Sequence, residues 1–241
     1  MATAVRGQDA TIYVDGIDAS AFLNEYEIDS KADDIEVAPF NDDKYYLAGP
    51  QEHDVTLSGY WNGDSGSLDE ILDDTFGSGQ ENVITICGGG VYSGKAAYLV
   101  SGTQVEYDVD AKSDDVTEAQ ADFRSSKNRG FILKDPQPVS GASGQGTEHT
   151  DAEATTRGGV GHLHVLDLGG ATSVKVEIEG SADGDTWAKL IDFGTISKKG
   201  GKKVQLSKVT AVPEKLRAKW TISGGTSPLV SFVCAFGRRK R

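Results

Sequence analysis

The segment Gly89–Ala96, which reads GGVYSGKA, matches a phosphate-binding loop up to its last position. Such a loop needs a Ser or Thr hydroxyl on magnesium at that position, and a helix whose N-terminus faces the phosphates. Here the last residue is alanine, and the residues that follow, Ala97–Val100, are typical of a strand. The segment is therefore predicted to be a glycine-rich hairpin, and no nucleotide or other cofactor is expected.

Two short motifs have residues that bind metal ions in other settings. His162 and His164 alternate on a predicted strand, but no third His, Cys or carboxylate lies at a recognisable ligand spacing. The run Asp183–Asp185, which reads DGD, resembles the start of a calcium loop but lacks the remaining ligands and the closing glutamate. The histidines are predicted to form a pair on one strand face, and the DGD run to be a turn before Trp187. No metal site is expected.

Acidic pairs are the remaining candidates for catalysis, because two carboxylates can serve as general acid and general base. Each pair lies beside polar or turn residues, as solvated loop charges do; the pairs are Asp33-Asp34, Asp42-Asp43, Asp73-Asp74 and Asp114-Asp115. No Ser-His-Asp or Cys-His grouping stands out. Cys87 and Cys234 are far apart without metal-ligand neighbours, so both are predicted to be buried. The chain is predicted not to be an enzyme.

Charge is distributed unevenly along the 241 residues, whose net charge is −13. Residues 1–134 contain 26 acids and 9 bases, whereas residues 135–241 contain 11 acids and 15 bases. This asymmetry favours two domains and argues against nucleic-acid binding by the first, because phosphate contacts require Lys and Arg. No run approaches the roughly 18 apolar residues that span a bilayer, and the start of the chain lacks an apolar signal segment. We expect no membrane partner and synthesis in a cytoplasm.

The elements that must position these residues are mostly short strands. Residues 135–158 are rich in Gly, Ser, Thr and Pro, which predicts a linker between a domain at 1–134 and a smaller domain at 159–241. Alternating apolar residues and turn signals predict strands near 10–14, 24–30, 53–60, 83–87, 96–108, 130–134, 162–168, 173–179, 187–193, 202–206, 216–222 and 229–236. One helix is expected at Ser67–Phe76, where Ser67 and Glu70 have capping-box spacing. The predicted fold class is all-β: a β-sandwich or barrel domain followed by a smaller β-sandwich of jelly-roll or immunoglobulin-like type.

Over residues 8–134 the chain resembles the major tail tube proteins of long-tailed bacteriophages. The resemblance lies in the order of several runs: IYVDGIDAS at 12–20, FLN at 22–24, DDIEVAPF at 33–40, YLAG at 46–49, HDVTLSGYW at 53–61, the predicted helix, GKAAY at 94–98 and VTEAQADF at 116–123. It implies a structural protein of the virion tail, present in the host cytoplasm during assembly, that forms stacked hexameric rings. It also implies tape measure and tail terminator proteins as partners, and genomic DNA that passes through the lumen without specific binding.

The resemblance assigns roles to two groups of residues. The stretch Ile28–Pro50 has little apolar patterning and is expected to be a long loop that reaches a neighbouring ring. Its contact residues are predicted to be Asp33, Asp34, Pro39, Phe40, Tyr45 and Tyr46. A channel wall rich in carboxylates repels DNA phosphates, and Glu106, Asp108 and Asp110 are predicted to face the lumen because strand alternation points them to one face.

The second domain resembles small β-sandwich modules appended to phage virion proteins, on the runs HLHV at 162–165, SADGDTW at 181–187 and FVCAFGR at 232–238. Such a module decorates the exterior of a tube, where Trp187 either contacts a host glycan or belongs to the core. The basic tail Gly237–Arg241 either is solvated or docks on the acidic domain of a neighbouring subunit. Two other functions stay open: another virion protein, such as a tail terminator or capsid decoration protein, and a carbohydrate-binding module or glycosidase.

Overall fold

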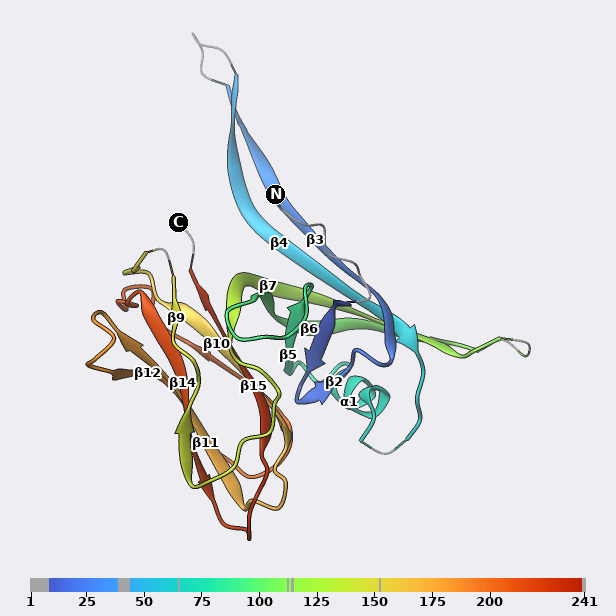
Figure 1. Ribbon diagram of the computed structural model, residues 1–241. Helices are drawn as coiled ribbons and strands as arrows, with labels where there is room; N and C mark the ends of the chain where they lie inside the picture. The colour runs from blue at the N-terminus through green and yellow to red at the C-terminus, as the bar shows by residue number, and fades with distance from the viewer. Residues whose placement is uncertain are drawn as a thin grey trace.

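Two antiparallel sheets contain nearly all of the regular structure in the computed structural model (Figure 1). The structure describes residues 9–38, 44–64, 66–111, 113, 115–151 and 153–239. Within these ranges there is one α-helix, α1 (Leu68–Thr75), and no helix is long and apolar enough to cross a bilayer. The all-β class predicted from the sequence is confirmed.

The larger sheet has ten strands, which come from both halves of the chain. They are β1 (Thr11–Val14), β2 (Ile17–Asp18), β3 (Leu23–Val37), β4 (Tyr45–Tyr60), β5 (Glu81–Cys87), β6 (Ala96–Asp110), β7 (Glu118–Lys134), β10 (Gly159–Asp167), β13 (Gly200–Gln205) and β15 (Ser231–Arg238). Their order is β13-β10-β15-β7-β6-β5-β1-β2, with β4 paired to β7 and β3 paired to β4. Because β7 pairs with β15, the sheet runs without interruption across the predicted boundary between the two domains.

The smaller sheet has five strands. It covers the strands of the larger sheet that come from the second half of the chain. Its strands are β8 (Ser143–Gln145), β9 (His149–Thr150), β11 (Ser173–Ser181), β12 (Ala188–Ile196) and β14 (Lys215–Ser223). Val174, Val176 and Ile178 alternate along β11 and are fully buried, as expected of a strand with one face on a core. They pack in one apolar cluster with Trp220 of β14 and Phe232 of β15. The two layers therefore form a sandwich.

The first half of the chain has its own apolar cluster, which includes Ile84 of β5, Val100 of β6 and Phe123 of β7. Helix α1 closes this cluster by burying Leu68 and Leu72, which lie four residues apart on one helix face. The side chain of the N-cap residue just before the helix accepts a hydrogen bond from the backbone N–H three residues on, at 3.4 Å. The helix predicted from the capping box is confirmed.

Residues 135–158, predicted to be a linker, are largely attached to the rest of the fold. β8 and β9 both pair with β14, and single bridges join Val139 to Val230 and Thr155 to Val212. Short edge pairings need few apolar side chains, since they satisfy backbone N–H and C=O groups, and composition alone therefore did not reveal them. The division into domains at 1–134 and 159–241 stays a prediction.

The stretch Ile28–Pro50, predicted to be a loop, forms most of a long β-hairpin instead. β3 and β4 pair from Leu23↔Gly59 out to Val37↔Tyr45, and the distal part projects from the body of the molecule (Figure 1). We call residues 31–37 and 45–52 the arm, because among the described residues these strand segments pair only with each other. A hairpin with both faces in solvent has no alternation of apolar and polar residues, which explains why the sequence pattern did not predict its strands.

Candidate functional site

The arm exposes large apolar side chains at a distance from either core. Ile35 is 49% exposed, Tyr45 49%, Tyr46 61% and Leu47 51%. The root of the same hairpin is different, because beyond His53 strand β4 pairs with β7 and buries its inward side chains against it. Contiguous exposed apolar side chains on a projecting element are typical of a protein–protein contact. The arm is therefore the first candidate surface.

Four of the six residues predicted to contact a neighbouring ring lie on the arm: Asp33, Asp34, Tyr45 and Tyr46. Pro39 and Phe40 lie outside the described residues. Glu36 and Lys44 form an ion pair at 2.5 Å across the hairpin, and the Tyr46 hydroxyl donates to Glu36 at 3.5 Å. Part of the charge on the arm is therefore neutralised within the same hairpin. The ring-contact role of these residues stays a prediction.

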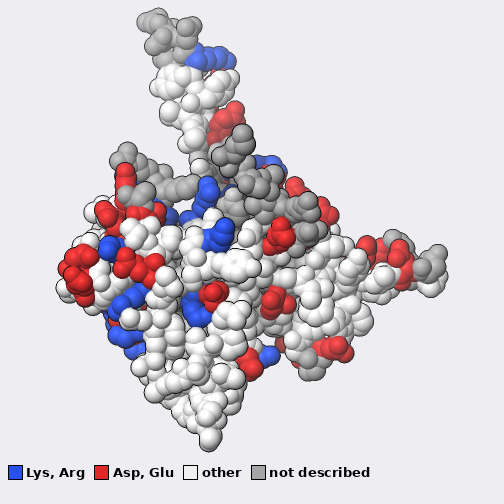
Figure 2. Space-filling view, viewed as in Figure 1, with Lys and Arg blue, Asp and Glu red and all other residues white. Residues whose placement is uncertain are grey.

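A second candidate surface is the acidic end of the β6–β7 hairpin, which we define as residues 105–110 and 118–122. Glu106, Asp108 and Asp110 occupy alternate positions of β6 with no register shift among them, so they share one face. All three are exposed, and Figure 2 shows Asp and Glu gathered on this projecting hairpin. Whether they face a lumen stays a prediction.

Carboxylates are crowded at this acidic end. Glu106 lies directly opposite Asp122 on β7 and two residues from Asp108, and both neighbours raise the pKa of the Glu106 carboxyl, Asp108 the more. Val105 and Val109 are nearly half exposed, at 48% and 47%, and Val109 lies on the strand face opposite the acids. The acidic end thus combines unfavourable like-charge contacts with solvent-exposed apolar side chains.

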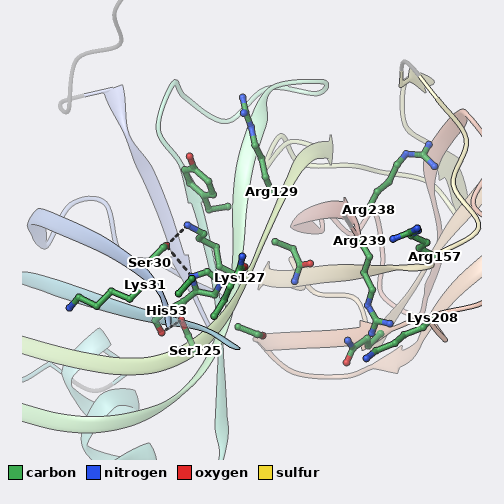
Figure 3. A pocket seen from close by; sticks show the side chains of 16 residues that line it. Ser30, Lys31, His53, Ser125, Lys127, Arg129, Arg157, Lys208, Arg238 and Arg239 are labelled. Atoms are coloured by element: carbon green, nitrogen blue, oxygen red, sulfur yellow. Dashed lines mark hydrogen bonds between the residues drawn. The ribbon is translucent and has the colours of Figure 1, made fainter. Parts of the chain in front are cut away.

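A third surface is a groove of about 1100 Å³ at the root of the arm (Figure 3). We call it the basic groove because its lining includes seven cationic side chains: Lys31, Lys127, Arg129, Arg157, Lys208, Arg238 and Arg239. No Asp or Glu is among the described residues that line it. In a chain of net charge −13, this concentration of positive charge is a local reversal.

The fourth feature, which we call the histidine seam, joins strands from the two halves of the chain that are not neighbours in the larger sheet. His162 and His164 of β10 are fully buried and meet Thr85 of β5 and Ser101 of β6. His162 contacts the Thr85 hydroxyl through Nδ1 at 3.2 Å and the Ser101 hydroxyl through Nε2 at 3.1 Å. His164 contacts the Thr85 hydroxyl through Nε2 at 2.8 Å, and its Nδ1 accepts from the Gly16 N–H at 3.3 Å. Every ring nitrogen of the pair has a partner.

The fixed donor at Gly16 determines the direction of this chain of hydrogen bonds. Because the Gly16 N–H points at Nδ1 of His164, that nitrogen is unprotonated, and Nε2 donates to Thr85. The Thr85 hydroxyl is then free to donate to Nδ1 of His162, whose Nε2 donates to Ser101. Burial lowers the pKa of His164 to about 3 and holds the pKa of His162 well below its usual value, so both rings are neutral near pH 7. The seam binds the chain's own hydroxyls, in agreement with the predicted strand-face pair.

The remaining sequence motifs lie where a structural role explains them. Gly89–Ala96 connects the antiparallel strands β5 and β6, as the predicted hairpin requires. The Asp183 carboxylate accepts from the backbone N–H groups of Asp185 and Thr186 at 2.9 and 2.8 Å, which confirms the predicted turn. Both cysteines are free and fully buried. Within the described ranges no three His, Cys, Asp or Glu side chains are arranged to hold a metal ion.

Trp187 is half-buried, and its indole is held by the chain itself. Its Nε1–H donates to the Gly184 carbonyl at 2.8 Å, and the Arg217 guanidinium lies 4.0 Å from the ring centroid. Arg217 is in turn paired with the carboxylate of Glu179 at 2.7 Å. One ring face is therefore covered, which leaves less of the indole for a glycan. The glycan contact stays a prediction.

Sequence reasoning missed the basic groove, because its cations come from the arm root, β7 and three later segments of the chain. Arg238 belongs to the basic tail that the sequence shows, and in the structure its side chain is held in place. Its guanidinium pairs with Asp151 at 2.8 Å and donates to three backbone carbonyls. The last two residues of the tail lie outside the described residues. The excess of bases after residue 134 was the one available signal.

No protein-family model matches the chain, and no curated protein matches it significantly. Among solved structures it is similar to a chain of the virion of a native gene transfer agent particle, with 16% identity, a TM-score of 0.41, and coverage of 53% of this chain and 98% of that one. It is also similar to the SPP1 tail tube, with 9% identity, a TM-score of 0.45, and coverage of 53% and 80%. A third similar structure is the SPP1 Dit protein, with 12% identity, a TM-score of 0.35, and coverage of 95% and 98%. At these identities and TM-scores the likenesses assign no function to this chain.

Proposed function

We propose that this chain is the structural, non-enzymatic subunit of a bacteriophage tail tube and assembles into stacked hexameric rings. The observation that carries the proposal is the arm, a projecting hairpin with Tyr46 61% and Leu47 51% exposed. Covering these side chains takes a second molecule, and copies of the same chain present equivalent surfaces to one another. The sequence resemblance over residues 8–134 supports the same assignment.

The edges of the larger sheet give a second reason for self-association. Among the described strands β3 pairs only with β4, so its outer side presents a row of backbone N–H and C=O groups. Such an edge pairs readily with a strand from another chain. Contacts between different faces of identical subunits close into rings when the rotation between subunits allows it. Rings of this kind, stacked through the arms, make a tube.

The charge of the chain suits a conduit for DNA. The whole chain has a net charge of −13, and its first half contains 26 acids and 9 bases. A channel wall made from this half repels phosphate and lets DNA move without specific binding. Glu106, Asp108 and Asp110 are the sequence-based candidates for that wall. By the same resemblance, the subunit contacts tape measure and terminator proteins, assembles in the host cytoplasm and remains in the virion tail. The resemblance of the second domain to virion β-sandwich modules puts that domain outside the tube.

Shortening the arm tests the proposal. Residues 33–50 are replaced by Asn-Gly, which joins Ala32 to Gln51 by a two-residue turn because these residues are already paired across the hairpin. The wild-type chain is expected to form long hollow tubes in negative-stain electron micrographs at high protein concentration. The shortened chain is expected to keep its circular dichroism spectrum and thermal midpoint and to form no tubes, because the apolar surface that joins rings is gone.

Two point variants provide a matched control. Tyr46→Ser removes an exposed apolar side chain from the arm, whereas Val209→Ser removes an apolar side chain that is 83% exposed elsewhere. We expect fewer or shorter tubes from the first and normal tubes from the second. A wild-type chain that stays monomeric at every concentration contradicts the proposal, and one that stops at single rings indicates a terminator rather than a tube subunit.

A further inference from the structure

The basic groove lies where the larger sheet divides. Strand β7 pairs with β4 as far as Ser125 and with β15 only from Phe131 onward. Between them, residues 126–130 have cross-strand partners in β6 alone, and the backbone of β15 lies close to Gly130 at the end of this stretch. In an antiparallel ladder alternate residues direct their N–H and C=O groups to opposite sides, so part of this stretch faces the groove without a strand partner. The fork therefore combines positive side chains with an open length of sheet edge.

Several cations of the groove have no counter-charge among the residues that the structure describes. Arg129, Arg157 and Lys208 are exposed, and no described carboxylate lies within ion-pair distance of them. Arg239 likewise has no described carboxylate partner, and its Nη1 is buried without a hydrogen-bond acceptor. Figure 3 shows Arg129 on the β7 side of the groove and the other cations of this group across from it. A buried donor without an acceptor and several like charges in one groove both favour an anionic occupant.

The size and lining of the groove favour a protein segment over a small molecule. Its 1100 Å³ exceeds the roughly 300–1,000 Å³ of ligand pockets, which are mainly lined by apolar side chains. Here Ser, Gln, Asn, Lys and Arg dominate the lining. An extended acidic segment satisfies both features, since its carboxylates reach the cations and its backbone reaches the open edge of β7.

The same chain carries an acidic segment with the complementary defect. At the acidic end Glu106 faces Asp122 and Asp110 faces Glu118 across the β6–β7 ladder, an arrangement that repels. The Oδ1 atom of Asp122 is buried and has no hydrogen-bond donor among the described residues. By contrast, acids of the arm region have cations nearby, such as Asp29 with Lys31 at 2.6 Å. Of the two projecting hairpins, the acidic end is therefore the one in which Glu106, Asp108 and Asp122 gather without an ion pair to a described Lys or Arg.

We propose that the basic groove of one subunit receives the acidic end of the β6–β7 hairpin of a neighbouring subunit. The proposal rests on the tube function and names one of the contacts that close its rings. Figure 2 shows Lys and Arg gathered at the root of the arm, and Asp and Glu on the hairpin that projects from another side of the molecule. Complementary patches on different faces give a head-to-tail contact, which generates rings rather than twofold dimers.

Nucleic acid is the competing occupant, because phosphates also complement Lys and Arg. A chain of net charge −13 repels a polyanion from solution, whereas ring formation holds a neighbour's hairpin next to the groove at high effective concentration. Docking also changes the place of Glu106 and Asp108, from the channel wall predicted by the sequence to a subunit contact. Acids on a channel wall tolerate charge reversal without loss of rings; acids in this contact do not.

A charge swap tests the docking. Variant one is Glu106→Lys with Asp108→Lys, variant two is Arg129→Glu with Arg157→Glu, and variant three combines all four. Each of the first two is expected to raise the protein concentration needed for ring formation at least about tenfold, measured by sedimentation velocity and negative-stain microscopy. Variant three is expected to recover ring formation, because every contact in the ring again joins opposite charges. Assembly of wild type is expected to weaken as salt rises.

The control is Lys198→Glu with Lys199→Glu, which reverses the same number of charges at exposed residues outside the groove and is expected to leave assembly unchanged. Circular dichroism spectra establish that each variant is folded. Normal rings from variants one and two overturn the docking and leave the tube function standing, and failure of variant three to recover overturns it as well. Binding of a 30-base-pair duplex that is lost in variant two, with rings intact, assigns the groove to nucleic acid instead. A wild-type chain that never assembles overturns both proposals.

Discussion

The histidine seam and the basic groove lie between the same two parts of the chain, the strands before residue 134 and those after residue 159. In the seam, neutral rings and hydroxyls satisfy one another, and all four ring nitrogens of His162 and His164 have partners. In the groove, Arg129, Arg157 and Lys208 have no carboxylate partner among the described residues. The seam is complete within one molecule, while the groove is incomplete without another. Polar groups that have partners within the chain thus mark a structural contact, and polar groups that lack them mark a contact with another molecule.

The largest effect expected to sharpen this comparison is the loss of stability on acidification. Unfolded histidines take up protons near pH 6.5, whereas His164 in the seam does so only near pH 3 and His162 likewise well below its usual pKa. Between these values the unfolded state binds more protons, so the free energy of unfolding falls as pH falls below about 6.5. From pH 7 to pH 5 the two residues are expected to remove about 4 kcal/mol together, measured by urea denaturation at each pH.

The matched control for acidification is the double variant His162→Gln and His164→Gln, which keeps polar side chains in the seam but removes their titration. Its free energy of unfolding should change much less between pH 7 and pH 5. The pKa of His149 is also lowered by burial, and it contributes the same sign in both proteins, so it cancels from the difference. Equal pH slopes for the two proteins contradict the picture of a neutral, buried seam.

The next largest effect is expected from removing one ring of the seam. His164→Ala leaves the Gly16 N–H without its acceptor, removes one of the two contacts of the Thr85 hydroxyl and opens a cavity, at an expected cost of about 3 kcal/mol. His53→Ala, at the rim of the groove, removes a single contact to the Ser30 hydroxyl at 3.0 Å and is expected to cost at most about 0.5 kcal/mol. Chemical denaturation of both variants measures the difference, and similar losses erase the distinction between seam and groove.

The smallest effect is expected in the groove of the isolated subunit. Arg129→Gln and Arg157→Gln remove charges that repel one another and pair with no described carboxylate, so stability is expected to stay within about 0.5 kcal/mol of wild type. Thermal unfolding at low protein concentration, where subunits are dissociated, measures this. A loss of stability above about 2 kcal/mol indicates that these arginines support the fold. It contradicts the distinction between a structural seam and an intermolecular groove.

Sequence patterns predicted the parts of the fold in which one face of an element is buried. β11 and β14 alternate clearly because one face packs on the core, and α1 follows from its cap and its apolar face. The strands of the arm were not predicted from the sequence, because both faces of the arm meet solvent and its register comes from backbone pairing alone. For the same reason the short strands β8 and β9 resembled a linker.

The candidate surfaces were predictable only where they lie on one stretch of chain. Glu106, Asp108 and Asp110 are two residues apart, and the pattern placed them on one face. The histidine pair was recognised for the same reason, but its partners Thr85 and Ser101 are 77 and 61 positions away from His162. The groove gathers its cations from five separate segments. Proximity of that kind comes from the order of strands in the sheet. The spacing of residues along the sequence does not predict that order.

The long strand β7 has a mechanical consequence. It pairs with the root of the arm at one end and with the second half of the chain at the other, while β6 runs beside it throughout. A tensile load applied along the arm therefore enters β7 in shear, so that many hydrogen bonds of the ladder share it instead of breaking one after another. Pulling on the arm would then unfold the subunit only by breaking many of these hydrogen bonds together.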